Sequence, residues 1–339
     1  MTQGLKDAGY HVVGAVENDR GAVATYSLNH PEARVFARDI RYLAVRHVMT
    51  DLGIGPGDLD LLAGCPPCQG FSTLTTRNGK VASDDPRNDL IRYYVRFVRV
   101  MRPKAILMEN VPGLLKDPRM AKAMDDLERL GYPVRSAARI VDAAGFGVPQ
   151  RRRRVVMMAA LGKSVPFPEP STDRPTVRTA IGDLCPAGQS GDPVHDHGER
   201  RTKAVAELIA NIPRDGGSRA DLGRDRQLKC HQQTDGFYDI YGRMSWEHPA
   251  PTITSGCTNP SKGRFLHPEE NRAITLREAA LLQAFPPAYR FTMKLGKEAI
   301  AAMIGNALPP PFVAAHAREV AKVLCPQGVG RPPARAAAG

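Results

Sequence analysis

Short apolar runs alternate with amphipathic stretches along the first half of the chain. Four runs have the length and apolar character of buried strands: His11–Val16, Asp60–Ala63, Ala105–Met108 and Val155–Ala160. Two stretches carry apolar residues at helical spacing and are followed by Pro103 or Gly131: Leu90–Met101 and Met120–Leu130. Strands that alternate with helices predict an α/β fold, with a mostly parallel sheet covered by helices on both faces.

The pattern weakens over Pro166–Arg243. Gly, Pro, Asp and Arg become frequent there and apolar periodicity is lost, which predicts a small, loop-rich domain. A regular pattern of apolar residues returns near Trp246. A capping box that joins Thr275 and Glu278 predicts the start of a helix through Phe285. Two further helices and a disordered Pro/Gly/Ala-rich tail are expected after it, over Lys297–Ile304, Phe312–Leu324 and 326–339.

Composition places the chain among globular proteins. With 339 residues, 42% of them hydrophobic, it is long enough for one large domain and a smaller one. No apolar run approaches the roughly 18–20 residues that span a membrane, and the first residues lack the layout of a secretory signal. We therefore expect a soluble cytoplasmic protein with no membrane partner. The net charge of +12 favours an acidic partner, of which nucleic acid is the commonest.

Four chemically active side chains come directly after predicted strands. They are Glu17, Asp39, Cys68 and Glu109. In open parallel sheets, ligands bind outside the carboxyl ends of the strands. The predicted sheet therefore gathers these four side chains at one edge.

Cys68 lies in a turn of sequence Gly-Cys-Pro-Pro-Cys-Gln-Gly-Phe-Ser, which runs from Gly64 to Ser72. A thiol fixed at such a turn can act as a nucleophile when its pKa is depressed. The pair Cys65 and Cys68 also fits a redox motif or half of a zinc site, and the turn alone does not decide between these. Zinc needs a second pair at suitable spacing, which the chain lacks, so no metal is expected. The six cysteines are too scattered for a disulfide framework and fit reduced thiols.

Further short motifs follow, and each alone would be a solvated turn or a generic phosphate-binding patch. Together they resemble the ordered motifs of the DNA (cytosine-5)-methyltransferases over nearly the whole chain outside Pro166–Arg243. In chain order the motifs are Glu17, Asp39-Ile40, Pro67–Gln69, Arg87–Leu90, Glu109–Val111, Gln150–Arg154, Arg243–Trp246, Pro249–Thr254, Arg272–Ala279, Leu282-Gln283, Gly305–Ala307 and Pro309-Pro310. So many motifs in one order make the resemblance highly specific.

The resemblance implies a catalytic mechanism. The target cytosine would be flipped out of the duplex, because a stacked base cannot be attacked, and Cys68 would add to its carbon 6. Glu109, kept protonated by burial, would donate a hydrogen bond to ring nitrogen 3. Arg154, with Arg152, would steady the base carbonyl and the nucleophile loop. The stretch Gly70–Gly79 resembles the mobile loop that closes over the flipped base.

The resemblance also implies S-adenosylmethionine as the methyl donor. Glu17 would bind the ribose hydroxyls, as acids after a second strand do in nucleotide-binding sheets. Asn18 occupies a position that is often aromatic in the family, which puts adenine stacking on that side in doubt. The complete implied cofactor pocket consists of Glu17, Asn18, Asp39, Ile40, Pro67, Leu90 and Asn306.

Four parts of the chain are expected on this basis. They are a catalytic and cofactor-binding domain over 1–165, a target recognition region over 166–243, a return to the sheet over 244–325, and the tail. The implied substrate is a short sequence in double-stranded DNA, bound by a monomer that associates with the nucleoid. A restriction endonuclease is the implied functional companion. The recognition sequence does not follow from the residues, because base readout by loops has no simple code.

One departure from the family concerns the start of the chain. Family members open with a strand and an Asp-x-Phe-x-Gly-x-Gly-Gly turn, whose glycines let the backbone approach the cofactor. Here Met1 falls just after that turn, and Gly4–Gly9 matches only the helix that follows it. The Rossmann-like sheet would then lack its first, central strand.

Two explanations compete: a misassigned or truncated start, or a damaged enzyme. We favour the first, since the other motif residues are intact. Two rival functions go with these explanations, a DNA-binding remnant without catalysis and a transfer RNA methyltransferase. The Gly-Phe-Ser that follows Pro67–Gln69 looks more like the DNA-modifying members.

We expect an N-terminally extended form to bind S-adenosylmethionine more tightly, and to melt at a higher temperature, than the 339-residue chain. The central strand would add a ladder of hydrogen bonds, and the glycine turn would add backbone contacts to the cofactor. Calorimetric titration and thermal unfolding of both forms measure this. Equal affinities and equal melting temperatures would refute it.

Overall fold

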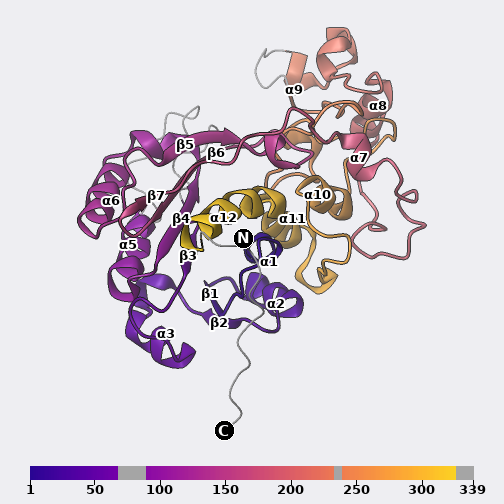
Figure 1. Ribbon diagram of the computed structural model, residues 1–339. Coiled ribbons are helices and arrows are strands. Elements are labelled where there is room, and N and C mark those ends of the chain that lie inside the picture. The colour runs from indigo at the N-terminus through magenta and orange to yellow at the C-terminus, as the bar shows by residue number, and fades with distance from the viewer. Residues whose placement is uncertain (68–88, 233–238, 326–339) are drawn as a thin grey trace. The chain divides into compact units, whose positions relative to one another are not determined.

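A computed structural model describes residues 1–67, 89–232 and 239–325 (Figure 1). Cys68, the predicted loop at 70–79, Arg87, Asn88 and the predicted tail lie outside the described residues. The chain divides into two compact units. Unit 1 consists of Met1–Tyr42, Val141–Arg154 and Glu169–Ala314, and unit 2 consists of Leu43–Ile140, Val155–Pro168 and Ala315–Gly339.

Unit 1 contains a small parallel sheet and a helical part. Its elements are α1 (Thr2–Asp7), β1 (Gly14–Glu17), α2 (Arg20–Asn29), β2 (Arg34–Ala37), α7 (Val177–Ile181), α8 (Lys203–Asn211), α9 (Lys229–Gln232), α10 (Leu276–Leu282) and α11 (Lys297–Asn306). Short 3-10 turns lie between them, at Ile40–Tyr42, Ala143–Phe146, Arg219–Asp221, Arg224–Arg226, Pro260–Lys262 and Met293–Leu295. The last helix, α12 (Pro310–Leu324), begins in unit 1.

The two strands of unit 1 run in the same direction. β1 pairs with β2 in parallel, and Glu17 lies opposite Ala37. α2 connects the strands, and it begins at Asp19, whose carboxylate accepts a hydrogen bond from the Ala22 N–H at 2.8 Å. The carboxyl ends of both strands therefore meet at one edge of this sheet.

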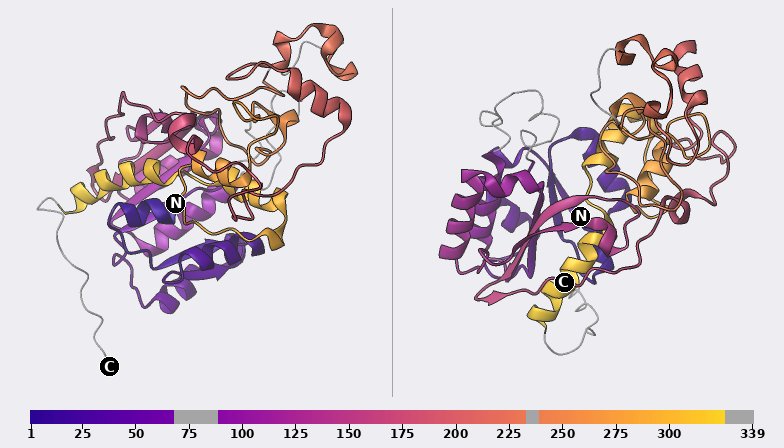
Figure 2. Two further views of the ribbon diagram at one scale, coloured as in Figure 1. Left: turned by 90° about the vertical axis from the view of Figure 1, so that its right-hand side faces the viewer. Right: turned by 90° about the horizontal axis from the view of Figure 1, so that it is seen from above.

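The helices α7, α10 and α11 share a core around Trp246. Apolar side chains of all three helices are buried there, among them Ile181, Leu276 and Ile300. α10 and α11 lie side by side in both figures, whereas α8 and α9 lie at the end of unit 1 away from α1 and α2 (Figures 1 and 2). The packed part of unit 1 thus surrounds α10 and α11.

The first turn of α10 holds a buried ion pair. The Thr275 hydroxyl accepts a hydrogen bond from the Glu278 N–H, and the Glu278 carboxylate accepts one from the Thr275 N–H, which confirms the predicted capping box. Arg272 donates to both oxygens of Glu278, at 2.7 and 2.8 Å. Burial alone would raise the pKa of Glu278, but the hydrogen bonds and charge of Arg272 hold that pKa below its ordinary value.

Unit 2 is a sheet covered by helices. Its elements are α3 (Val45–Leu52), β3 (Leu61–Gly64), α5 (Leu90–Met101), β4 (Ala105–Asn110), the 3-10 turn Pro112–Lys116, α6 (Pro118–Arg129), β5 (Ala138–Asp142), β6 (Arg153–Ala160), β7 (Lys163–Ser164) and the later part of α12. The strand order is β3-β4-β6-β5, with β7 paired to β6. β3 is parallel to β4, and β6 is antiparallel to it.

The centre of unit 2 lies between β4 and the pair α5 and α6. All six residues of β4 are buried, as expected for a strand that is paired at both edges. α5 and α6 lie beside the sheet (Figures 1 and 2) and pack into one apolar cluster with Met108 and Met157. The side chains that α5 buries recur at helical spacing, and they are Ile91, Tyr94, Val95, Phe97, Val98 and Met101.

The predicted α/β fold is confirmed, and α5 has the predicted bounds. The antiparallel pair of β4 and β6 makes the sheet of unit 2 mixed. Several predicted bounds were wrong by one or two residues, and two were wrong by three. α10 ends at Leu282 and not at Phe285, because Ala284 has a left-handed backbone with φ of 58° that cannot continue the helix. β1 begins only at Gly14. Among the described helices, none is long and apolar enough to cross a membrane.

We expect Glu278→Gln to lower the free energy of unfolding by about 3 kcal/mol or more, because it leaves Arg272 buried beside a neutral amide. Urea unfolding followed by the fluorescence of Trp246, the single tryptophan, measures this in unit 1. Glu270→Gln is the matched control. Glu270 binds the same arginine but is 44% exposed, so its loss should cost less than about 1 kcal/mol.

The same pair gives a pH dependence with a definite sign. Because the folded pKa of Glu278 is depressed, its stabilisation is present above the ordinary pKa and is lost as the pH falls through the lowered value. The stability difference between the protein and Glu278→Gln should therefore shrink on acidification. Equal effects of the two glutamate substitutions at neutral pH would contradict the assignment.

Candidate active site

The turn that precedes Cys68 is attached to the end of β4. β3 and β4 are parallel neighbours, so the residues that follow β3 leave the sheet beside Glu109 and Asn110. The Asn110 side-chain amide donates a hydrogen bond to the Pro66 carbonyl at 2.7 Å, and its oxygen accepts one from the Val111 N–H at 2.8 Å. Asn110 is only 5% exposed, so water competes little for these bonds. They fix the chain two residues before Cys68.

Glu109 is buried in the same strand. Its exposed fraction is 7%, and it lies opposite Val156 of β6. The burial that the proton-donor role requires is therefore present. A carboxyl group at this depth can donate a hydrogen bond when it carries its proton.

α5 supports this turn from the side. A Cβ on Gly64 would lie 2.7 Å from a ring carbon of Tyr94, so the ring packs directly on the glycine backbone. The Tyr94 hydroxyl lies 3.2 Å from the Leu62 carbonyl and 3.3 Å from that of Leu107, and donates to them. Burial raises the pKa of Tyr94, which keeps this hydroxyl a donor. Leu90, a predicted cofactor residue, begins this helix and is half-buried.

In unit 1, predicted cofactor residues gather at the carboxyl ends of β1 and β2. One oxygen of Glu17 accepts hydrogen bonds from the N–H groups of Asn18 at 2.7 Å and Asp19 at 3.0 Å, which fixes the carboxylate. Asp39 accepts hydrogen bonds from the backbone and the guanidinium of Arg41. The guanidinium hydrogen bond lowers the pKa of Asp39.

This edge fits the nucleoside part of S-adenosylmethionine. A carboxylate fixed at a strand end can accept hydrogen bonds from two neighbouring ribose hydroxyls. Asp39 and Ile40 follow the adjacent strand, where the base of a nucleoside would lie. Asn306 is the exposed residue at the end of α11, while Gly305 beside it is buried.

The run Arg151–Arg154 separates into two kinds of side chain. Arg151 and Arg153 are exposed, whereas Arg152 is only 4% exposed, as the alternation of a strand predicts. Arg154 is half-buried and donates to the Arg153 carbonyl at 2.7 Å. The Arg152 guanidinium instead donates to the backbone carbonyls of Ile253 at 2.9 Å, Gly305 at 2.9 Å and Ala307 at 3.2 Å.

The predicted site residues fall into two groups. Unit 1 carries Glu17, Asn18, Asp39, Ile40, Arg152, Arg154 and Asn306. Unit 2 carries Pro67, Leu90 and Glu109. Cys68 lies outside the described residues. The structure thus defines the geometry within each group, and the roles of these residues remain predictions.

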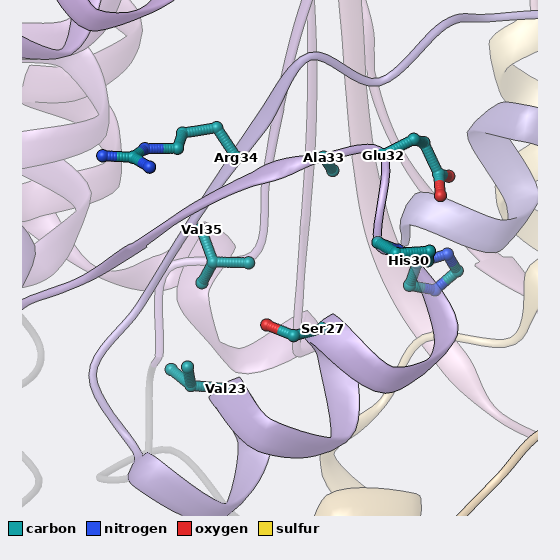
Figure 3. Close-up of a pocket in the computed structure, with 8 residues that line it drawn as sticks. Val23, Ser27, His30, Glu32, Ala33, Arg34 and Val35 are labelled. Carbon is teal, nitrogen blue, oxygen red and sulfur yellow. The ribbon is translucent and has the colours of Figure 1, made fainter.

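A shallow pocket in unit 1 lies away from these residues. Figure 3 shows its lining, which comes from Val23 and Ser27 of α2 and from His30–Val35. The pocket therefore lies at the amino end of β2, whereas Glu17 and Asp39 follow the carboxyl ends of the strands. We do not assign it to the cofactor.

Three buried polar residues escaped the sequence-based site. Asn110 holds the turn before Cys68, and Gln150 and Gln283 hydrogen-bond each other at 2.5 Å. Both glutamines are 0% exposed. A polar residue inside an apolar helical run, such as Gln283 after Ala279–Leu282, is the signal that could have found one of them.

The parallel strand pairs, with acidic residues at their carboxyl ends, are typical of a Rossmann-like α/β fold. A profile of the family described as C-5 cytosine-specific DNA methylase matches residues 1–322. The Type II methylase M.HgiDII of Herpetosiphon aurantiacus is 32% identical, over 96% of this chain and 92% of the relative. The Type II methyltransferase M1.HphI of Haemophilus parahaemolyticus is 33% identical, over 94% of this chain and 83% of the relative.

Solved structures agree with this relationship. A prophage-encoded protein of E. coli, assigned as a DNA modification methyltransferase, superposes with a TM-score of 0.67 at 25% identity, over 95% of both chains. The chain belongs to the C-5 cytosine-specific DNA methylase family. It is accordingly an enzyme of the DNA (cytosine-5-)-methyltransferase class, whose members depend on S-adenosylmethionine.

We expect Gly305→Ala to destabilise unit 1 by about 3 kcal/mol. A Cβ at this position would lie 2.2 Å from the Thr254 carbonyl carbon and 2.3 Å from the Ser255 nitrogen, and backbone atoms cannot yield as a side chain does. Gly198→Ala is the matched control, since among the described residues no atom lies within 4 Å of its added Cβ. It should change stability by less than about 0.5 kcal/mol. Thermal unfolding measures both, and equal melting temperatures would disprove the close approach.

Proposed function

We propose that this chain methylates carbon 5 of cytosine within a specific sequence of double-stranded DNA, through a covalent bond between Cys68 and a base flipped out of the duplex. The observation that carries the proposal is the hydrogen bond from Asn110 to Pro66. It attaches the start of the nucleophile turn to the strand that contains the buried Glu109. Family membership supplies the class of reaction, and this arrangement supports the roles of the two residues.

The chemistry requires a nucleophile and a proton donor. Carbon 5 of cytosine is a poor nucleophile until the Cys68 thiolate adds to carbon 6, which gives carbon 5 the character of an enamine. Addition drives negative charge toward ring nitrogen 3, where protonated Glu109 donates a hydrogen bond. After methylation a base removes the proton from carbon 5. The bond from carbon 6 to sulfur then breaks and restores the thiolate.

S-adenosylmethionine supplies the methyl group from its sulfonium centre. Glu17 binds the ribose hydroxyls, since its carboxylate is already oriented by two backbone N–H groups. Asp39 and Ile40 would border the adenine, with the Asp39 carboxylate oriented by the Arg41 guanidinium. Three further residues complete the proposed pocket, namely Pro67, Leu90 and Asn306.

The DNA is bound through Arg154 and through the target recognition region. Arg154 steadies the carbonyl of the flipped base, and the region 166–243, which includes α8 and α9, reads the sequence. The net charge of +12 supports binding to phosphates. The names of the relatives as Type II enzymes support a role in protecting DNA from a companion restriction endonuclease.

We expect a duplex that contains 5-fluorocytosine to form a stable adduct on Cys68 in the presence of S-adenosylmethionine, because fluorine cannot leave as a proton does. Mass spectrometry of the tryptic peptide measures it. Cys65→Ala, which alters the exposed thiol three residues away, is the matched control and should still form the adduct, whereas Cys68→Ala should not.

Glu109→Gln should slow transfer of labelled methyl groups by about a hundredfold or more. The proposal would be overturned if neither this chain nor an N-terminally extended form gave the adduct on Cys68.

A further inference from the structure

α11 ends in a turn whose carbonyl groups are bound by side chains from distant parts of unit 1. The last carbonyls of a helix have no partner within the helix and must find one elsewhere. Gln283 donates to the carbonyls of Ile304 at 2.7 Å and Ala307 at 2.8 Å. Arg152 donates to the carbonyls of Gly305 at 2.9 Å and Ala307 at 3.2 Å. Two side chains therefore hold three of the carbonyls in this turn.

These two side chains belong to one buried network. Gln150 donates to the Gln283 side chain at 2.5 Å and accepts from the Ile253 N–H at 2.8 Å, and Arg152 donates to the Ile253 carbonyl at 2.9 Å. Both glutamines are 0% exposed and Arg152 is 4% exposed. Polar groups at this depth are costly to leave unpaired, so the loss of one member disturbs the others.

Two further features restrain the turn. The positive guanidinium of Arg152 lies at the C-terminus of α11, which is the negative end of the helix dipole. In addition, Gly305 packs backbone to backbone against Thr254 and Ser255. Asn306 is the exposed residue of this restrained turn. The restraint therefore fixes where the Asn306 side chain begins.

We infer that Arg152 and Gln283 are positioning residues that present Asn306 to S-adenosylmethionine, and that Arg152 does not touch the substrate base. The Arg152 guanidinium is committed to three backbone carbonyls and is almost inaccessible to solvent. Arg154 remains the arginine for the base. The inference rests on the proposed function in one respect, which is that Asn306 contacts the cofactor.

A double-mutant cycle on this chain tests the inference. Arg152→Lys keeps the positive charge but loses the planar guanidinium, which can donate to several carbonyls at once. Asn306→Ala removes the side-chain amide that is proposed to contact the cofactor. We expect each substitution alone to raise the Kd for S-adenosylmethionine about tenfold. The double variant should bind no more weakly than Asn306→Ala, because Arg152 acts through Asn306. At saturating S-adenosylmethionine, kcat on duplex DNA should stay within about twofold for Arg152→Lys.

Hydrogen–deuterium exchange gives a second readout that needs no cofactor. Arg152→Lys and Gln283→Met should both speed exchange over residues 299–308, since each leaves helix carbonyls without donors. Arg243→Lys is the matched control. Arg243 is 0% exposed and donates to the carbonyls of Ile209 and Ile212, outside α11. It should lower the melting temperature but change neither the affinity for S-adenosylmethionine nor exchange over 299–308.

The outcomes separate this inference from the proposed function. Additive losses of affinity in the cycle, or a fall in kcat without a change in Kd for Arg152→Lys, would place Arg152 at the substrate and overturn the inference. Unchanged exchange over 299–308 in both variants would also overturn it. If Asn306→Ala alone leaves the affinity unchanged while Arg152→Lys loosens the turn, the cofactor role proposed for Asn306 fails and the restraint by Arg152 stands.

Discussion

The hydrogen bond from the Asn110 amide to the Pro66 carbonyl is the constraint on which the catalytic side of this enzyme depends. The parallel pairing of β3 and β4 brings the two strand ends together, but strand pairing stops at Gly64. Beyond that point the chain could leave the sheet in many directions. Asn110 selects one of them, and because it follows Glu109 directly, its side chain connects the turn after β3 to the strand that carries Glu109. A shift of β4 would therefore carry both groups with it.

The same physical device recurs in unit 1. There, Arg152 and Gln283 bind the carbonyls that end α11, and Arg243 binds those that end α8. In each case a side chain from a distant motif satisfies backbone groups that the local structure leaves unpaired. Such bonds act beside the apolar core that α10 and α11 share. This explains how a region with few strands and short helices keeps a defined geometry.

The sequence predicted the fold class, the bounds of α5 and the capping box of α10, because each depends on local periodicity or on a short-range hydrogen-bond pattern. It placed a strand before Asp39 without giving its bounds, and it did not predict β5, whose exposed residues interrupt the apolar pattern. The predicted end of α10 was wrong because Ala284 has a left-handed backbone, for which Ala has no preference and which the sequence therefore does not signal. The hydrogen bond between Gln150 and Gln283 joins residues 133 positions apart, and no local pattern predicts which two residues pair.

The arginine run shows why motif positions alone do not assign roles. In the sequence, Arg152 and Arg154 are equivalent members of one motif. In the structure, Arg152 is buried against helix carbonyls just before β6, whereas Arg154, within β6, is half-buried. A buried guanidinium that binds carbonyls is hard to redirect toward a base, since every carbonyl it left would lose a donor inside the protein. Burial and partner identity thus turn one of two matching arginines into part of the scaffold, and only the other is suited to meet a substrate.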